Sequence, residues 1–231
     1  MDLLIGSNNP SKITMFRDMI TQTGLSVRLL TLQELGIRSE PAETGRTPLE
    51  NAVIKARFYR NYCDNVITDD AGFYLADLDP DDPRQPGLNV RTPQDALPDD
   101  ILPLYAPDIP RGHRLDNEEM AAYYINLVKR IIAEKQNGST SSDPAGICRS
   151  LPAYFHFANA IWHNNRMYTY AEPLEEALQL SFPVYDHILN RDSAGWPIDW
   201  LTDSDWHDSS KSRLAEEQHM RRIRFIRDTL S

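Results

Sequence analysis

The sequence predicts an α/β protein in which helices flank a mixed β-sheet. Two observations predict this class. Apolar runs of strand length alternate with amphipathic runs of helix length in the first half of the chain, and a hairpin pattern follows in the second half. The alternation is typical of parallel strands joined by helices, whereas the hairpin adds antiparallel strands. With 231 residues, the chain suits one large domain or a two-lobed one.

The N-terminal stretch predicts a strand, a polar turn and a helix. Residues 1–5 are mostly apolar, and Pro10 marks a first helical position. The stretch "GSNNPSK", residues 6–12, starts directly after the strand and is predicted to form a turn at a helix N-terminus. N–H groups without partners and the helix dipole favour an anion at such a turn. Lys12 adds a full positive charge. The plainer alternative is a capped helix after an edge strand, and the stretch is not a Walker loop.

The next elements are a second strand with a turn over residues 25–37, a loop, and a helix that begins after Thr47. Thr47, Pro48 and Glu50 have the spacing of a capping box with proline at the first helical position. The predicted inner face of this helix consists of Ala52, Val53, Ala56 and Tyr59 or Arg60.

Two adjacent acids, Asp69 and Asp70, are predicted to end a short strand before an Ala71-Gly72 turn and a further strand. Two carboxylates at close range raise one pKa or recruit a cation, and Mg²⁺ prefers carboxylate oxygen. Glu43 offers a third carboxylate, and Lys55 is expected to reach the same place. The alternative is that the acids cap a turn and Lys55 is a solvated helix charge. Together these residues and the anion-favouring turn indicate phosphoryl chemistry with a metal.

The second half of the chain predicts an excursion, a helix, a hairpin and a last helix. Residues 80–112 are rich in proline and aspartate, since eight of the sixteen prolines lie between Pro80 and Pro110, and we expect an irregular surface segment. The later elements are a helix over 116–135, a loop over 137–146, two strands around the turn 163–166, the stretch "SFPVYDHILN", and a helix from about Ser210.

Composition restricts the classes of partner and location. The formal net charge of −10 argues against a nucleic-acid partner, because counterion release needs clustered Lys and Arg. Cys63 and Cys148 allow one disulfide, although two free thiols are the favoured expectation. No run resembles a signal peptide or a membrane span, so the cytoplasm is the expected location and no membrane partner is expected.

Three stretches resemble the Ham1-like inosine triphosphate pyrophosphatases. "GSNNPSK" is similar to their Thr-Gly-Asn-x-x-Lys opening, and "ETGRTPLENAVIKAR" to their Glu-x-Gly-x-Thr-x-x-Glu-Asn-Ala-x-x-Lys-Ala segment. "ITDDAGFYLADL" and "PGLNVR" resemble their Asp-Asp-Ser-Gly-Leu strand and the Pro-Gly-x-x-Ser-Ala-Arg that follows. Order and spacing agree over about residues 1–91. The 116–135 helix and "RSLPAYFHFANAIW" fit more loosely, and the excursion is longer than the family usually shows.

The resemblance implies an ITPase-like (Ham1/Maf-type) fold, a single two-lobed domain over residues 1–231 with a mixed, twisted sheet, flanking helices and a central cleft. It implies a homodimer. It also implies Mg²⁺-dependent hydrolysis of nucleoside triphosphates to monophosphate and pyrophosphate, with Mn²⁺ as an alternative ion. The implied substrates are deaminated purines such as ITP, dITP and XTP, which makes the implied role that of an XTP/dITP diphosphatase in nucleotide pool sanitation.

The resemblance also assigns roles to residues of the first half. Phosphate contacts fall to Ser7, Asn9, Lys12 and Lys55. Glu43 and Asp70 are the implied metal ligands, and Asp70, with Asp69 beside it, is expected to orient or deprotonate the attacking water. Lys55 is expected to stabilise charge that develops in the transition state. Arg91 aligns with a family arginine near the cleft, and Ala71 replaces the family serine.

The C-terminal half departs from the family at the residues that recognise the base. Tyr185 and Asp186 fit the Gly-Phe-Gly-Tyr-Asp-Pro motif, but the Phe position falls on Pro183 unless Phe182 has moved by one residue. The late Lys and the Ser-His-Arg motif have only loose counterparts, which are Lys211 with Arg213, or His219 with Arg221.

Several alternatives stay open for this half. The charged residues Arg213, His219, Arg221 and Arg222 also fit the solvated face of an amphipathic helix. The tryptophans Trp196, Trp200 and Trp206 suit core or dimer contacts, or a replacement stacking wall. The alternative functions are therefore a pyrophosphatase with a different base preference, and a catalytically weakened nucleotide-binding or interaction protein.

Overall fold

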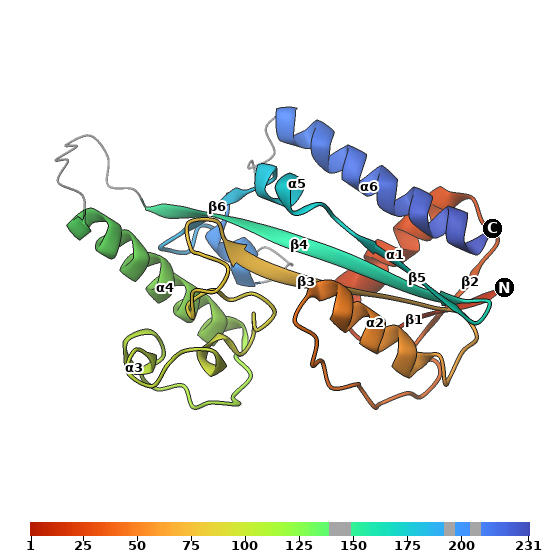
Figure 1. Cartoon of the computed structure of the whole chain (residues 1–231), viewed down its shortest axis with the longest axis horizontal. Coiled ribbons are helices and arrows are strands. Elements are labelled where there is room, and N and C mark those ends of the chain that lie inside the picture. The colour runs from red at the N-terminus through yellow and green to blue at the C-terminus, as the bar shows by residue number, and fades with distance from the viewer. Residues whose placement is uncertain (139–148, 192–196, 204–208) are drawn as a thin grey trace. The chain divides into compact units, whose positions relative to one another are not determined.

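The computed structural model describes residues 1–138, 149–191, 197–203 and 209–231, except for the side chains of 137, 138 and 209–212 (Figure 1). The chain divides into two compact units. Unit 1 comprises Met1–Gly72, His156–Ala177 and Ser210–Ser231, and unit 2 comprises Phe73–Phe155 and Leu178–Ser209. The predicted loop over 137–146 falls almost entirely outside the described residues, as do Cys148, Trp196 and Trp206.

The described strands form one mixed sheet, which confirms the predicted α/β class. Its order is β2-β1-β3-β4-β5, and β6 pairs with β4. Strand β1 (Asp2–Ile5) runs parallel to β2 (Arg28–Thr31) and β3 (Val66–Leu75). Strand β4 (Ser150–His163) is antiparallel to β5 (Arg166–Ala171) and β6 (Phe182–Tyr185). Strands β3 and β4 each run from one unit into the other.

Helices surround the strands in both units. Unit 1 holds α1 (Pro10–Thr23), α2 (Pro48–Tyr59) and nearly all of α6 (Ser209–Leu230). Unit 2 holds α3 (Leu102–Tyr105), α4 (Asn117–Gly138) and the 3₁₀ turns η1 (Pro93–Asp95) and η2 (Pro197–Leu201). Helix α5 (Leu174–Gln179) begins in unit 1 and ends in unit 2. No helix in the described part of the chain has the length and apolar character needed to cross a membrane.

Side-chain alternation along the strands of unit 1 creates two apolar layers. Leu3, Ile5 and Ile67 pack with residues of α1 and α6. Leu4 and Val66 pack on the other side, with Tyr59 of α2. Because successive strand residues point to opposite faces, this register decides which helix each later residue of β3 meets.

Local sequence signals confirm several predicted boundaries. The Thr47 hydroxyl accepts from Glu50 N at 3.1 Å and caps α2. The Glu50 carboxylate accepts from Arg46 N at 2.5 Å, one residue before the cap, instead of from Thr47 as in a standard capping box. The β4–β5 hairpin turns at Asn164 and Asn165, with φ angles of 50° and 59°, the positive values that a type I′ turn requires.

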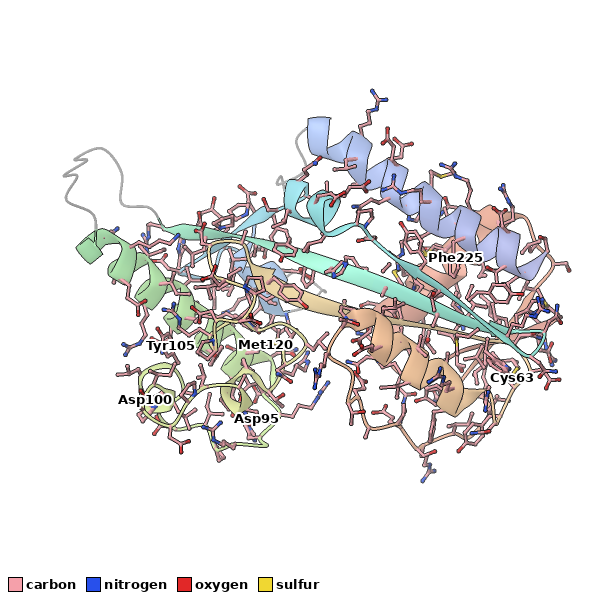
Figure 2. All side chains as sticks on the ribbon, in the orientation of Figure 1. Cys63, Asp95, Asp100, Tyr105, Met120 and Phe225 are labelled. Carbon is pink, nitrogen blue, oxygen red and sulfur yellow. The ribbon has the colours of Figure 1, made fainter. Side chains whose placement is uncertain are left out.

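The inner face of α2 differs from the prediction at one position. Ala52, Ala56 and Tyr59 are buried as predicted, and Tyr59 is thus the buried member of the pair Tyr59 or Arg60, but Val53 is only half-buried. Past the helix end, the half-buried Cys63 is a free thiol in this structure (Figure 2).

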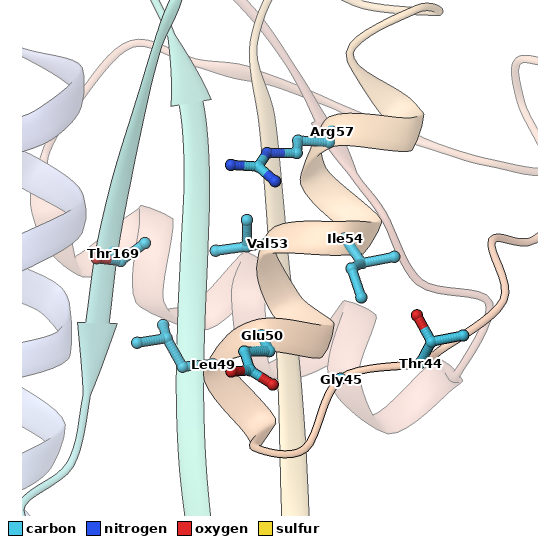
Figure 3. Close-up of a pocket in the computed structure, with 8 residues that line it drawn as sticks. All are labelled: Thr44, Gly45, Leu49, Glu50, Val53, Ile54, Arg57 and Thr169. Atoms are coloured by element: carbon cyan, nitrogen blue, oxygen red, sulfur yellow. The ribbon is translucent and has the colours of Figure 1, made fainter.

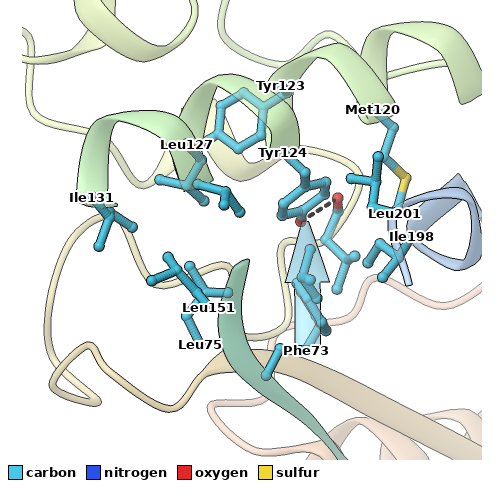
Figure 4. Packing of buried hydrophobic residues seen from close by; sticks show 14 of the residues in the cluster. Phe73, Leu75, Met120, Tyr123, Tyr124, Leu127, Ile131, Leu151, Ile198 and Leu201 are labelled. Carbon is cyan, nitrogen blue, oxygen red and sulfur yellow. Dashed lines mark hydrogen bonds between the residues drawn. The ribbon is translucent and has the colours of Figure 1, made fainter. Parts of the chain in front are cut away.

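Apart from the short elements η1 and α3, the proline-rich segment 80–112 is irregular, as predicted, but it does not lie wholly on the surface. Val90, Gln94, Leu97 and Tyr105 are buried. Except for Gln94, these side chains belong to the core of unit 2, in which Tyr124 stacks edge-on against Phe73 (Figure 4). The Tyr124 hydroxyl donates to Val90 O at 3.0 Å. Proline has no backbone N–H that needs a hydrogen-bond partner. Burying a proline-rich segment therefore costs less free energy than burying other irregular chain.

A buried polar cluster inside unit 1 joins α6 to β4 and to Glu172, the residue directly after β5. Arg222 Nε donates to Asn159 Oδ1 at 3.1 Å, and its guanidinium lies 5.5 Å from the Phe157 ring. Glu172, only 5% exposed, lies in the same cluster. Burial raises the pKa of Glu172 to about 6, and Arg222 offsets only part of that rise.

We expect Glu172 to make the stability of the chain depend on pH. The folded state holds this proton up to about pH 6, whereas the unfolded chain releases it near the ordinary value of 4.5. The free energy of unfolding therefore falls as pH rises through this window, by at most about 2 kcal/mol. In urea titrations, the free energy of unfolding of Glu172→Gln relative to that of the wild type should rise by this amount between pH 4 and pH 7. The exposed neighbour Glu175→Gln should run parallel to the wild type, and a parallel curve for Glu172→Gln would refute the assignment.

Candidate active site

The N-terminal turn is held by a close approach and by a cap. A Cβ atom on Gly6 would lie 2.6 Å from Thr68 Cγ2 and 2.7 Å from Tyr59 Cδ2, so only glycine fits there. Asn9 Oδ1 accepts from Ser11 N at 2.9 Å and caps α1, and Asn9 N donates to the Ser7 hydroxyl at 3.2 Å. The predicted strand, turn and helix are confirmed. The capped helix of the plainer alternative is present too, but β1 lies between β2 and β3 and is not the edge strand that this alternative named. Phosphate binding by Ser7 and Asn9 stays a prediction.

Lys12, in the first turn of α1, forms an ion pair with Asp69. Its Nζ lies 2.9 Å from Asp69 Oδ2, and the side chains are 24% and 2% exposed. The other carboxylate oxygen, Asp69 Oδ1, is buried and has no hydrogen-bond partner among the described residues. A carboxylate buried this far needs a cation beside it, and Lys12 supplies that cation.

Lys55 lies between two carboxylates on the α2 side of the sheet. Its Nζ is 2.7 Å from Asp70 Oδ1 and 3.1 Å from Glu43 Oε1. Burial lowers the pKa of Lys55, but the charges and hydrogen bonds of Asp70 and Glu43 outweigh burial and leave that pKa above its ordinary value. Lys55 is therefore a fixed positive charge within reach of both predicted metal ligands.

Asn51 joins the two chain segments that carry those carboxylates. Its Nδ2 donates to Asp70 Oδ2 at 3.2 Å, and its Oδ1 accepts from Gly45 N at 2.8 Å. The residue is 2% exposed. Sequence reasoning missed Asn51, although a polar residue directly before Ala52, on the apolar face of a helix, was a usable signal.

The predicted turn at Ala71-Gly72 is wrong. Residues 66–75 form a single strand, β3, because β3 continues beside the long strand β4 after β1 has ended at Ile5. Asp69 and Asp70 are therefore successive strand residues whose side chains point to opposite faces. Asp69 meets α1 through Lys12, and Asp70 meets α2 through Lys55. The two acids do not form the side-by-side carboxylate pair that the sequence suggested.

The remaining carboxylates nevertheless suit a magnesium ion. No group of three or more His, Cys, Asp or Glu side chains within the described ranges is gathered to hold a metal. Glu43 and Asp70 do converge, since both approach the same Lys55 ammonium within about 3 Å. Mg²⁺ is commonly held by one or two carboxylates, with water and substrate phosphates as the other ligands. Glu43 and Asp70 would supply the two carboxylates of such a site.

A pocket of about 460 Å³ lies in unit 1 against α2 and does not include the lysine–carboxylate cluster (Figure 3). Leu49, Val53 and Ile54 give it an apolar wall, and Thr169 lies across from them on β5. Glu50 and Arg57 add opposite charges. None of the predicted site residues lines this pocket.

The predicted base-recognition residues of unit 2 lie in different environments. Phe182 is 4% exposed and its ring stacks on Phe155 at 5.5 Å, which favours a packing role. Tyr185 is half-buried and lies edge-on to His187. Asp186 accepts from Arg149 Nε at 3.2 Å and lies 2.8 Å from His187 Nδ1. Burial raises the pKa of Asp186, but these partners outweigh it and the pKa falls below its ordinary value.

The C-terminal helix places its candidates against unit 1. His219 Nε2 lies 3.3 Å from Gln22 Nε2 on α1, and Arg221 forms an ion pair with Glu176 on α5. Arg213 is exposed and pairs with Glu217 four residues later. This arrangement agrees with the alternative that Arg213 lies on the solvated face of an amphipathic helix. Arg222 belongs instead to the buried polar cluster with Asn159 and Glu172. The side chain of Lys211 lies outside the described residues.

Two further candidates have structural partners in unit 2. Arg91 donates to Leu115 O at 3.1 Å and to Asn117 Oδ1 at 3.2 Å, at the start of α4. Trp200 is half-buried in η2, with the Arg191 guanidinium 5.9 Å from its ring centre. Both arrangements hold loops of unit 2 in place.

The fold and this cluster define an α/β protein with a candidate phosphate- and metal-binding site. The sequence model of the Ham1 family matches residues 3–94, and the resemblance to the Ham1-like family is confirmed. A dITP/XTP pyrophosphatase of Thermoanaerobacter pseudethanolicus is 36% identical over 89 residues, 38% of this chain and 42% of that protein. A dITP/XTP pyrophosphatase of Corynebacterium efficiens is 35% identical over 121 residues, which are 49% of this chain and 56% of that protein. The chain thus spans about half the length of these curated relatives.

Solved structures extend the likeness to the whole chain. The Ham1 protein of Staphylococcus aureus superposes with a TM-score of 0.56 at 18% identity, covering 100% of this chain and 98% of the other. A nucleoside-triphosphatase / dITP/XTP pyrophosphatase of Mycobacterium abscessus superposes with a TM-score of 0.53 at 16% identity, and it covers the same shares of the two chains. The chain therefore has the Ham1 fold, and residues 3–94 carry the family's sequence pattern.

We expect Asn51→Ala to destabilise the chain by about 1–3 kcal/mol, because it leaves Asp70 Oδ2 and Gly45 N without a buried partner. Chemical denaturation at pH 7 measures the loss. Asn61→Ala is the matched control, since Asn61 is exposed and donates to Phe58 O just after the end of the same helix. Equal small losses in both variants would show that Asn51 does not hold the site together.

Proposed function

We propose that the chain is a nucleoside triphosphate pyrophosphatase that acts on deaminated purine nucleotides such as dITP, XTP and ITP. The observation that carries the proposal is the convergence of Lys55, Glu43 and Asp70, with Lys12 and Asp69 on the adjacent face of β3. The relatives named dITP/XTP pyrophosphatase support it, because the family match over residues 3–94 contains all of these residues.

The proposed reaction is hydrolysis of the anhydride between the α and β phosphates. Water adds to phosphorus, the bridging P–O bond breaks, pyrophosphate leaves, and the proton of the water passes to Asp70. Lys55 and Lys12 neutralise phosphate charge, and Ser7 and Asn9 position the phosphates from the N-terminal turn. Glu43 and Asp70 would hold Mg²⁺, which when bound would neutralise phosphate charge further.

A different base preference is the second candidate. The Phe182 ring lies in the core of unit 2, and His219 and Arg221 contact helices of unit 1, so none of these residues is held ready for a base. A pocket selects strongly against an analogue only when buried polar groups are placed to read it. The homodimer and the cytoplasmic location stay predictions.

Pyrophosphate release with Mg²⁺ should be measured on ITP, dITP, XTP, GTP, ATP, dUTP and dTTP. We expect turnover that is strongest on ITP, dITP and XTP, and a comparable rate on other bases would favour the second candidate. Asp70→Asn should lower kcat by about 100-fold or more, because it removes the proposed base. Asp77→Asn is the control, since Asp77 pairs with Lys135 in unit 2, outside the site.

Two results would contradict the proposal. Unchanged pyrophosphate release by Asp70→Asn would overturn the role given to Asp70. No release from any nucleotide, at several pH values and with Mn²⁺ as well, would favour a nucleotide-binding or interaction protein.

A further inference from the structure

The lysine that the proposed reaction assigns to phosphate is already held by carboxylates. Lys55 Nζ contacts Asp70 Oδ1 at 2.7 Å and Glu43 Oε1 at 3.1 Å, and it lies 3.4 Å from Asp69 O. These contacts surround the ammonium with oxygen acceptors, and the Lys55 side chain is only 13% exposed. A phosphate oxygen that approaches Lys55 therefore competes with two carboxylates.

The same contacts act against a divalent cation. Glu43 and Asp70, the two carboxylates that fit Mg²⁺, share one ammonium group. A cation that arrives alone must displace Lys55 or accept its repulsion, and a displaced Lys55 would be left partly buried without an anion. A triphosphate that arrives alone would draw Lys55 away and leave Asp70, whose side chain is 10% exposed, without a cation.

We propose that cation binding and triphosphate binding are coupled by an exchange of ion-pair partners, in which the divalent cation takes Glu43 and Asp70 while Lys55 passes to a phosphate. The exchange rests on the proposed function, because it assumes a triphosphate ligand. When both ligands arrive, every charge that was paired stays paired. Asn51 donates to Asp70 Oδ2 and not to the oxygen that Lys55 contacts, so it holds the Asp70 carboxylate in place before and after the exchange.

The exchange predicts gains of binding that a purely structural ion pair would not give. Lys55→Met should bind Mn²⁺ alone more tightly than the wild type, because Glu43 and Asp70 lose their internal competitor. Asp70→Asn should bind inorganic tripolyphosphate more tightly in excess EDTA, because Lys55 loses its closest carboxylate. Each gain should be about 5- to 150-fold, the usual range for coupling between two ligands.

Electron paramagnetic resonance measures free Mn²⁺ in the first titration, and calorimetry measures tripolyphosphate binding in the second, both on the full chain. Lys135→Met and Asp77→Asn are matched controls, because they break another lysine–carboxylate pair, 2.6 Å apart and outside the site, with the same changes of charge. The controls should bind both probes as the wild type does. Circular dichroism of each variant verifies folding, and the two titrations test the exchange through different variants.

The outcomes separate the exchange from the function on which it rests. If the wild type releases pyrophosphate from dITP but neither variant gains affinity beyond its control, the exchange is overturned and the proposed function stands. If the wild type binds no tripolyphosphate even with Mn²⁺ and releases no pyrophosphate, the proposed function fails and the exchange fails with it. Gains in both variants, absent from both controls, support the exchange.

Discussion

The alternation of side chains along β3 is the constraint on which the candidate site depends. Asp69 and Asp70 are neighbours in sequence, yet strand geometry sends one toward α1 and the other toward α2. The apolar residues before them set this register, since Ile67 packs with the α1 side and Val66 with the α2 side. A shift of β3 by one residue would bury the carboxylates against the wrong helices. The packing of the core therefore fixes the electrostatics of the site.

Each buried carboxylate needs a cation, and each helix supplies one lysine. The Asp69 and Asp70 side chains are 2% and 10% exposed, so their charges are costly without Lys12 and Lys55. The N-terminal turn can approach β3 because Gly6 has no Cβ to meet Thr68. The loop that carries Glu43 is tied to α2 through Gly45 and the carboxamide of Asn51. These contacts lead from backbone geometry to a defined set of charges, and the proposed phosphoryl transfer would depend on such a set for positioning and neutralisation.

Features that depend on local chemistry could be predicted from the sequence, and features that depend on distant partners could not. The cap of α2 and the turn at Asn164-Asn165 follow from residues within one or two turns of chain, and they were predicted, whereas the cap of α1 was named only as an alternative. The continuity of β3 was missed because Asp-Asp-Ala-Gly resembles a turn, while its strand conformation comes from β4, about eighty residues away. Burial within 80–112 was missed for the same reason, since α4 supplies the contact that Tyr124 makes with Val90. The candidate site residues of the first half were proposed from the family resemblance and its motif spacing, and Asn51 was overlooked because its hydrogen bonds require two partners from separate segments.

The two halves of the chain have different sequence relationships to the Ham1 proteins, and the chemistry explains why. The family match ends at residue 94, whereas the structural likeness covers the whole chain at under 20% identity. Cores of equal volume tolerate extensive apolar substitution, so the later strands and helices keep their arrangement with different residues. The Lys55–Asp70 pair has less freedom, because an apolar group of similar size in place of Lys55 would leave the Asp70 carboxylate, which is 10% exposed, without its cation. The family's sequence pattern therefore covers the part of the chain that holds these charges, whereas the likeness of the remainder is one of fold.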